Sequence, residues 1–365
     1  MRFKVLAKDL KDILYLFKFT EKDGDDILNS LLLELKSTGL FLTGRDISMA
    51  LVKNIEILES QGVGRVIINS KVFSNIVRVI DMTETITCEI QDDSFIISTL
   101  KTSYKLNLIK SEYPEVRTTE ITNNFSVIGK ELVKALDKVS ICIDANSNKI
   151  EYTGLKLELI NKNEVLLNGF SIQRIAVAKC DVNSQSEDVI VNIPKKAITE
   201  ISKIFYIDDV IEFNINKDNG HVHIFNETTH FYSKTIPSYP KSLKRFFEKE
   251  YFGNIVFNRK ELLNSCKMVN TINKDKELAP IIMKIRDNVE ITCISYQYGK
   301  ASDIINPISC SISVFDLGIN ATQFIEILTL MKSETVELKF SQVNKEPFVL
   351  KNDNVEYLLM PVVFY

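Results

Sequence analysis

The chain of 365 residues has no tryptophan, only 3 histidines, and little glycine (12) or proline (8). So little glycine and proline excludes collagen-like and linker-dominated chains. No apolar run reaches the ~18 residues that a membrane-spanning helix needs. Residues 1–5 carry Arg2 and Lys4 where a secretory signal would be apolar. These absences predict a cytoplasmic globular protein that makes no membrane contact.

The cysteines are scattered, and no two of them form a C-x-x-C pair. A disulfide-stabilised secreted domain or a zinc ribbon would cluster its cysteines. We therefore expect reduced, mostly buried thiols at Cys88, Cys142, Cys180, Cys266, Cys293 and Cys310.

Catalytic motifs are also missing. The sequence contains neither a G-x-x-x-x-G-K-[ST] phosphate loop nor a G-x-S-x-G nucleophile elbow. His221 and His223 alternate in a predicted strand, with His230 beyond it, so these side chains could face one side and bind a metal ion. We favour surface strand histidines, and predict no catalytic residue, no metal and no cofactor. A metal enzyme built on these histidines stays open as a minor alternative.

What the sequence has instead is a threefold repeat. The length alone predicts two or three domains of ~150 residues. Three segments open alike, with a short alternating strand followed by a helix, and align on Lys8, Lys130 and Lys260 at spacings of 122 and 130 residues. Apolar residues at i, i+3, i+4 and i+7, as in residues 10–17, predict the helices.

A second strand–cap–helix pattern recurs halfway through each third. Helices are predicted at residues 70–80, 194–205 and 321–331, with Asn69 or Ser70 and Asn320 as caps and Pro194 in a first turn. Strand-like runs separated by turn residues follow each helix. One apolar helix stripe cannot bury itself, so two helices must cover one face of a sheet. We predict an α+β fold of three similar domains, at residues 1–120, 121–247 and 248–365.

The outward faces of these helices are basic, although the net charge of the chain is −3. Lysines decorate many solvated helices, but repetition in at least four helices favours an electropositive surface that contacts phosphates. The basic stripes almost lack aromatic residues for base stacking, which favours a duplex over single strands. The stripe cations that we expect at DNA are Lys71, Arg78, Lys134, Lys138, Lys195, Lys196, Lys203 and Lys267.

Several segments resemble the bacterial DNA polymerase III beta subunit, the replicative sliding clamp. They are Leu40-Phe-Leu-Thr-Gly-Arg-Asp46, the Tyr113-Pro114 and Tyr239-Pro240 turns, and the terminal Tyr357-Leu-Leu-Met-Pro-Val362. The resemblance covers the whole chain. It implies three clamp domains and a ring-shaped, head-to-tail homodimer, with helices lining the hole. Such a ring would encircle double-stranded DNA whatever its sequence and act as a non-catalytic processivity factor. A clamp-fold interaction scaffold that does not encircle DNA is the alternative.

The resemblance also assigns residues to three surfaces. It adds Lys22 and Lys149 to the DNA-facing positions. A cleft between the second and third domains would take a short peptide motif of DNA polymerase, clamp loader and repair proteins. Its residues would be Tyr152, Phe170, Ile172, Arg174, Ile175, Pro240, Val343, Leu358, Met360, Pro361 and Val362. The subunit interface would join Tyr104 and Leu106 of one chain to Ile272 and Leu278 of the other. In residues 170–175 only Arg174 is identical to the family's usual Thr-Asp-Gly-His-Arg-Leu.

Overall fold

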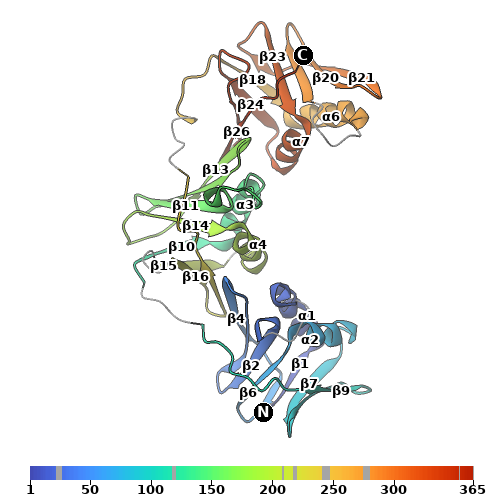
Figure 1. Ribbon diagram of the computed structural model, residues 1–365, viewed down its shortest axis with the longest axis vertical. Coiled ribbons are helices and arrows are strands. Elements are labelled where there is room, and N and C mark those ends of the chain that lie inside the picture. The colour runs from blue at the N-terminus through green and yellow to red at the C-terminus, as the bar shows by residue number, and fades with distance from the viewer. Residues whose placement is uncertain are drawn as a thin grey trace.

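The computed structural model describes residues 1–21, 27–116, 121–207, 209–216, 220–240, 247–273, 280–352 and 354–364. The elements form three consecutive units of similar make-up. In Figure 1 the units follow one another along an arc, with a pair of helices from each unit on the inner, concave side.

The first unit contains β1 (Arg2–Leu6), α1 (Ala7–Leu16), η1 (Lys18–Thr20), η2 (Ile27–Asn29), β2 (Ser30–Lys36), β3 (Gly39–Arg45), β4 (Met49–Ile55), β5 (Glu59–Gln61), β6 (Gly64–Asn69), α2 (Ser70–Val79), β7 (Thr85–Gln91), β8 (Ser94–Ser98) and β9 (Ser103–Asn107). The second contains β10 (Asn123–Ile128), α3 (Gly129–Ser140), η3 (Ile150–Tyr152), β11 (Gly154–Ile160), β12 (Glu164–Phe170), β13 (Arg174–Asp181), β14 (Val189–Pro194), α4 (Lys195–Ile204), β15 (Val210–Asn216), β16 (His221–Phe225) and β17 (Thr229–Lys234). The third contains β18 (Gly253–Asn258), α6 (Arg259–Val269), η4 (Asn270–Ile272), β19 (Pro280–Ile285), β20 (Val289–Ser295), β21 (Gly299–Ile305), β22 (Ser309–Cys310), β23 (Phe315–Asn320), α7 (Ala321–Leu330), β24 (Thr335–Phe340), β25 (Phe348–Asn352) and β26 (Val355–Leu359).

Asparagine side chains begin three of the helices. Asn69, Asn258 and Asn320 each accept a hydrogen bond from the backbone N–H three residues later, at 3.0, 3.1 and 3.0 Å. These bonds satisfy donors that the first helical turn leaves without a partner. Pro194 is predicted in the first turn of its helix but lies instead at the N-cap of α4, directly before the first helical residue. Its backbone is extended (ψ 141°), so it does not belong to the helix.

Each unit buries the apolar stripes of two helices that pack against each other: α1 with α2, α3 with α4, and α6 with α7. In α3 the buried stripe includes Leu132, Leu136 and Val139, which leaves the lysines of this helix outside the core. The predicted α+β fold of three similar units is confirmed by this arrangement and by the fold comparisons below.

The sheets run on from one unit to the next. Strand β4 of the first unit pairs antiparallel with β17 of the second, which places Leu51 opposite Phe231. Strand β13 of the second unit pairs with β26 of the third, which places Ala176 opposite Tyr357. We call these two strand pairs, with the contacts beside them, seam 1–2 and seam 2–3.

Strands β9 and β21 are the last strands of their sheets among the described residues, with orders β5-β1-β7-β8-β9 and β21-β20-β19-β23. They belong to the two end units of the arc, so an unpaired strand edge lies in each end unit.

Five of the cysteines are buried, and Cys310 is exposed. Burial raises the pKa of the Cys142 and Cys180 thiols to about 12, so these thiols stay protonated and unreactive at neutral pH. No described helix is long and apolar enough to cross a membrane.

Candidate functional site

The predicted DNA-facing cations among the described residues lie on or beside the concave-side helices, and several of them are already paired with acids. Lys134 and Lys203 each bind the glutamate three residues earlier in the same helix, at 2.7 and 2.9 Å. Arg78 lies 3.7 Å from Glu21. These acids accompany the basic side chains on the same helices or close by, so the concave side is less positive than the basic residues alone suggest.

Two of the predicted cations hold the protein together. Lys196 of α4 forms an ion pair with Asp46, in the turn between β3 and β4, across seam 1–2. Burial raises the pKa of Asp46, but hydrogen bonds from Lys196 and from the backbone N–H groups of Ser48 and Met49 outweigh it, so the pKa lies below its usual value. Lys195 donates to the carbonyl of residue 143 at 2.7 Å. Both ammonium groups therefore stabilise the fold, in addition to any contact that they make with DNA.

The remaining cations differ in their availability. In the part of the chain that the structure describes, Lys138 and Lys267 form no ion pair, and each lies in the last turn of its helix. The ammonium of Lys149 lies over the ring of Tyr152, 5.3 Å from its centroid. Lys71 is half-buried in the first turn of α2. Lys22 lies outside the described residues.

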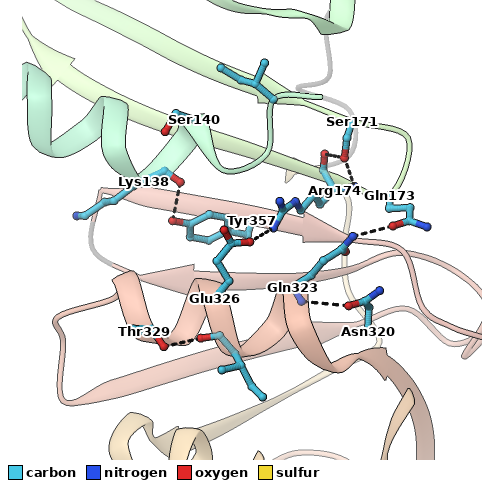
Figure 2. Close-up of polar contacts among 12 residues, drawn as sticks. Lys138, Ser140, Ser171, Gln173, Arg174, Asn320, Gln323, Glu326, Thr329 and Tyr357 are labelled. Carbon is cyan, nitrogen blue, oxygen red and sulfur yellow. Dashed lines mark hydrogen bonds and ion pairs between the residues drawn. The ribbon is translucent and has the colours of Figure 1, made fainter. Parts of the chain in front are cut away.

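A set of polar contacts ties the second unit to α7 of the third (Figure 2). Arg174 donates to Glu326 at 2.5 Å, and Gln323 donates its side-chain amide hydrogen to Gln173 at 2.6 Å. Successive side chains of a strand point to opposite faces. Because Arg174 turns toward α7, it lies on the opposite sheet face from its neighbour Ile175.

The structure brings several predicted cleft residues together on the outer side of seam 2–3. Ile175 lies directly opposite Leu358 in the β13–β26 pair. The rings of Tyr152 and Phe170 are stacked, with centroids 6.4 Å apart. Ile172 is exposed in the turn between β12 and β13.

The chain after β26 lies along the same edge. The Met360 N–H donates to the carbonyl of residue 173 at 2.9 Å, and the Val362 N–H donates to the Gly318 carbonyl at 2.9 Å, with Pro361 between them. A Cβ atom on Gly318 would come within 2.1 Å of the Val362 carbonyl oxygen, so only glycine permits this approach. Pro240 is buried after β17, whereas Val343 is exposed between β24 and β25. Arg174, on the opposite sheet face, is set apart from the apolar group.

A pocket of about 550 Å³ continues from this group along the outer face of β11, β12 and β13. Phe170 belongs to both, and Leu166 and Val177 add apolar lining. Lys179 pairs with Glu164 at its rim, at 3.3 Å. Most of the remaining lining is polar or charged, including Lys156, Glu158 and Asn168, so the pocket pairs an apolar end at Phe170 with a polar wall.

Three of the predicted subunit residues are described, and they lie at or beside the two free strand edges. Tyr104 and Leu106 are half-buried in β9. Ile272 lies in η4, which contacts both β20 and β21. Leu278 lies outside the described residues.

The histidines form a stacked group on β16 and β17. Nε2 of His223 lies 3.1 Å from Nδ1 of His230, and the His223 ring stacks between Phe225 and Tyr232. Burial and the neighbouring His230 lower the pKa of His223 to about 4. Within the described ranges, no group of three or more potential ligands could hold a metal ion.

Helix pairs along the inside of an arc, backed by sheets that continue across each seam, define a DNA clamp with three units per chain. Residues 4–117 match the N-terminal domain of the DNA polymerase III beta subunit, and residues 126–241 match its central domain. The chain belongs to the DNA polymerase III beta subunit family, the bacterial sliding clamps.

Known relatives cover most or all of the chain. The beta sliding clamp of Helicobacter pylori (strain J99) is 25% identical over 99% of this chain and 100% of its own. The beta sliding clamp of Mycoplasma capricolum is 23% identical over 82% of this chain and 80% of its own. The crystal structure of the Helicobacter pylori beta clamp bound to a DNA ligase peptide, 25% identical, superposes with a TM-score of 0.87 over 100% of both chains. The Pseudomonas aeruginosa beta subunit, 17% identical, shares the fold with a TM-score of 0.91 over 100% of both chains.

Sequence reasoning missed the polar residues of the seams. Asp46, Gln323 and Glu326 have no special spacing, and each finds its partner more than 140 residues away along the chain. Asp46 stood inside the Leu-Thr-Gly-Arg-Asp segment that carries the family resemblance, which was the one available signal.

Proposed function

We propose that two copies of this chain close head-to-tail into a ring that encircles duplex DNA and tethers a DNA polymerase and other partners to it. The observation that carries the proposal is the pair of free edges, β9 and β21, at the two ends of an arc whose internal seams are both antiparallel strand pairs. Edge strands with unpaired backbone groups readily pair with another chain.

The repeat predicts which residues would meet at the ring-closing seam. The hairpins β3–β4, β12–β13 and β20–β21 are equivalent in the three units. At the same position in each, the second strand is paired with the first: Leu51 with Gly44, Ala176 with Gly169, and Ala301 with Cys293. The hairpins β16–β17, β25–β26 and β8–β9 are equivalent in the same way. Their matching pairs are Phe231 with Ile224, Tyr357 with Leu350, and Tyr104 with Ile97. Leu51 meets Phe231 in seam 1–2, and Ala176 meets Tyr357 in seam 2–3. By equivalence, Ala301 of one copy would meet Tyr104 of the other, and Ser302 would meet Ser103.

Duplex DNA would pass through the ring beside the concave-side helices. Lys138 and Lys267 are the predicted cations best placed to contact phosphates, since no described acid pairs with them. Phosphate contacts carry no sequence information and weaken with salt. A ring held by topology needs only such weak contacts, and the acids that pair with Lys134 and Lys203 keep them weak.

Partners would dock by a short peptide motif on the outer side of seam 2–3. The apolar group of Tyr152, Phe170, Ile175 and Leu358, with the adjoining pocket, supports this assignment. The Helicobacter pylori relative was crystallised with a DNA ligase peptide, which supports a peptide ligand here too. Tethering a polymerase to the ring raises its effective concentration at the DNA, which is the physical basis of processivity.

The same proposal divides the chain into three domains. Residues 1–120, 121–247 and 248–365 would be the three clamp domains, with domain junctions between β9 and β10 and between β17 and β18. The protein would act in the cytoplasm as a non-catalytic processivity factor, without a bound cofactor or metal.

A cross-linking experiment tests the ring. With Cys310 replaced by serine, Ser103→Cys and Ser302→Cys together should give a covalent dimer, because directly opposed residues of an antiparallel pair have Cα atoms ~4.5–5.5 Å apart, within disulfide range. Lys105→Cys with Ser302→Cys is the offset control and should cross-link poorly. The oxidised ring should stay on nicked circular plasmid and slide off after linearisation.

The scaffold alternative makes a different forecast: a cross-linked dimer that is not retained on circular DNA. A metal enzyme on the histidines has less support, since His223 and His230 already bond to each other and no third ligand joins them among the described residues.

A further inference from the structure

The two internal seams share a second contact besides strand pairing. In each, the turn at the end of one unit's strand hairpin touches the beginning of a helix in the next unit. In seam 1–2 the β3–β4 turn supplies Asp46 to Lys196, the second residue of α4. In seam 2–3 the β12–β13 turn and the start of β13 supply Gln173 and Arg174 to α7. Both turn–helix contacts are polar, and each includes an ion pair.

The equivalent pieces at the ends of the arc are the β20–β21 turn and helix α2. All three receiving helices begin directly after a strand of the same kind, with Asn69, Pro194 and Asn320 at their caps. Val72 is therefore the counterpart of Ala197 and of Gln323. The β20–β21 turn consists of Tyr296, Gln297 and Tyr298, with no charged residue.

Exposure supports the equivalence. Ala197 is 2% exposed, whereas its counterpart Val72 is 44% exposed. Gln323 is half-buried and bonded to Gln173. Tyr296 is fully exposed and Tyr298 is 46% exposed, on a hairpin beside the free edge of β21. Large apolar side chains left in water at both ends of the arc are typical of surfaces that another protein covers.

We propose that the ring-closing seam has an aromatic contact in place of the ion pair found at each internal seam: Tyr296 and Tyr298 of one copy pack on the first turns of α2 of the other, over Val72 and the aliphatic stem of Lys71. This inference rests on the head-to-tail ring proposed above and adds the chemistry of its joint. Two tyrosines supply large rigid contact area, and a lysine beneath an aromatic ring is held by a cation–π contact.

A tyrosine hydroxyl adds one polar contact at the same joint. Tyr357 donates to the carbonyl of Lys138, the tenth residue of α3, at 3.0 Å across seam 2–3 (Figure 2). Tyr104 is the counterpart of Tyr357, and the tenth residue of α6 is Met268. Tyr104 of one copy accordingly donates to the Met268 carbonyl of the other.

Salt distinguishes this joint from an ionic one. Surface ion pairs weaken as salt rises, whereas buried apolar contacts do not. The strand register also sets Lys105 of one copy opposite Lys300 of the other, and salt relieves the repulsion of like charges. The ring should therefore keep its dissociation constant, or tighten slightly, as salt rises.

Sedimentation equilibrium of the full chain tests the joint. Tyr296→Ser with Tyr298→Ser should raise the dimer dissociation constant at least about tenfold. Val72→Ser, on the receiving helix, should weaken the dimer in the same direction, and all three substituted side chains are exposed. Tyr206→Ser is the matched control, because Tyr206 is an exposed tyrosine of the second unit, away from both free edges. The wild-type dissociation constant should vary less than about threefold between about 50 and 500 mM NaCl.

The outcomes separate this inference from the ring itself. A wild-type dimer that the tyrosine and Val72 changes leave intact, or that dissociates steeply with salt, overturns the aromatic joint while the ring stands. A monomeric wild-type chain overturns both. A Tyr104→Phe variant that dimerises as well as the wild type removes the Met268 contact alone.

Discussion

Lys196 of the second unit holds Asp46 of the first, on the inner side of the seam where β4 meets β17. The Asp46 carboxylate is buried and also accepts the backbone N–H groups of Ser48 and Met49, at 2.7 and 2.8 Å. The basic stripe of this helix predicts that Lys196 contacts DNA. A loss of DNA retention in a Lys196 variant would therefore report seam damage as well as lost phosphate contact.

We expect Lys196→Met to lower the free energy of unfolding by about 1–3 kcal/mol, since it leaves a buried carboxylate short of a partner. Denaturant unfolding at neutral pH measures this. Lys134→Met, which breaks an exposed pair on α3, should cost less than about 1 kcal/mol. Equal losses in the two variants would contradict a special role for the seam pair.

The pKa of Asp46 lies below its usual value of 3.8 in the folded chain, so its contribution to stability is present above that value. It is lost as the pH falls through the lower, folded-state pKa. In Asp46→Asn this part of the acid dependence should disappear. Thermal melts from about pH 5 to pH 2.5 compare the two chains, and parallel curves would count against the assignment.

Lys138 and Lys267 provide the cleaner test of the concave face, because neither holds a described acid. Lys138→Gln with Lys267→Gln should weaken binding to a short duplex severalfold and lower the slope of log affinity against log salt by about 0.9 for each lost contact. Fluorescence anisotropy across a salt series measures both.

Lys179→Gln with Lys351→Gln removes the same charge from the outer face of the sheets, where both lysines line the pocket. Duplex affinity and its salt slope should not change in this control. An equal effect of the two double variants would mean that net charge alone governs DNA binding.

Ile172 and Ile47 form a matched pair for testing the cleft. They occupy equivalent turns at the two seams and are almost equally exposed, at 72% and 75%. Ile172→Ser should reduce the affinity of a fluorescent, leucine-anchored partner peptide about tenfold, whereas Ile47→Ser should leave it unchanged. The same loss in both variants, or in neither, would move the peptide site elsewhere.

His223 should make the fold sensitive to mild acid. Its pKa is lowered to about 4, so the unfolded chain takes up a proton near pH 6.5 that the folded chain resists until about pH 4. Stability falls over that window as the pH drops. In His223→Phe the melting temperature should vary less between pH 7 and pH 4.5 than in the wild type. His221→Phe, on the same strand, serves as the control and should retain the wild-type dependence.

The regular elements were readable in the sequence because each depends on local signals. The 3.6-residue spacing marked the helices, and Asn69 and Asn320 marked where two of them begin. The strand pairs of the seams were not readable, because Leu51 meets Phe231 through a register that no local pattern specifies. The same limit applied to charge: a lysine stripe predicts a basic face, but only the fold shows that Glu131 and Glu200 accompany it.

For the predicted cleft, the family resemblance named the residues but not the directions of their side chains. Arg174, the one identity in its segment, faces α7 and Glu326 instead of lining the apolar group with Ile175. Successive side chains of a strand face opposite sides. A prediction that β13 begins at Arg174 would therefore have placed Arg174 and Ile175 on opposite faces of the sheet.

The continuity of the sheets across the seams has a mechanical consequence. Inside one protomer, every junction between units is crossed by the polypeptide itself as well as by backbone hydrogen bonds, so pulling it apart stretches covalent chain. In the proposed ring, the joint between β9 of one protomer and β21 of the other has no such covalent link. In the proposed ring, tension from bent DNA or from a bound protein would therefore separate the joints between protomers first, because only non-covalent contacts hold them.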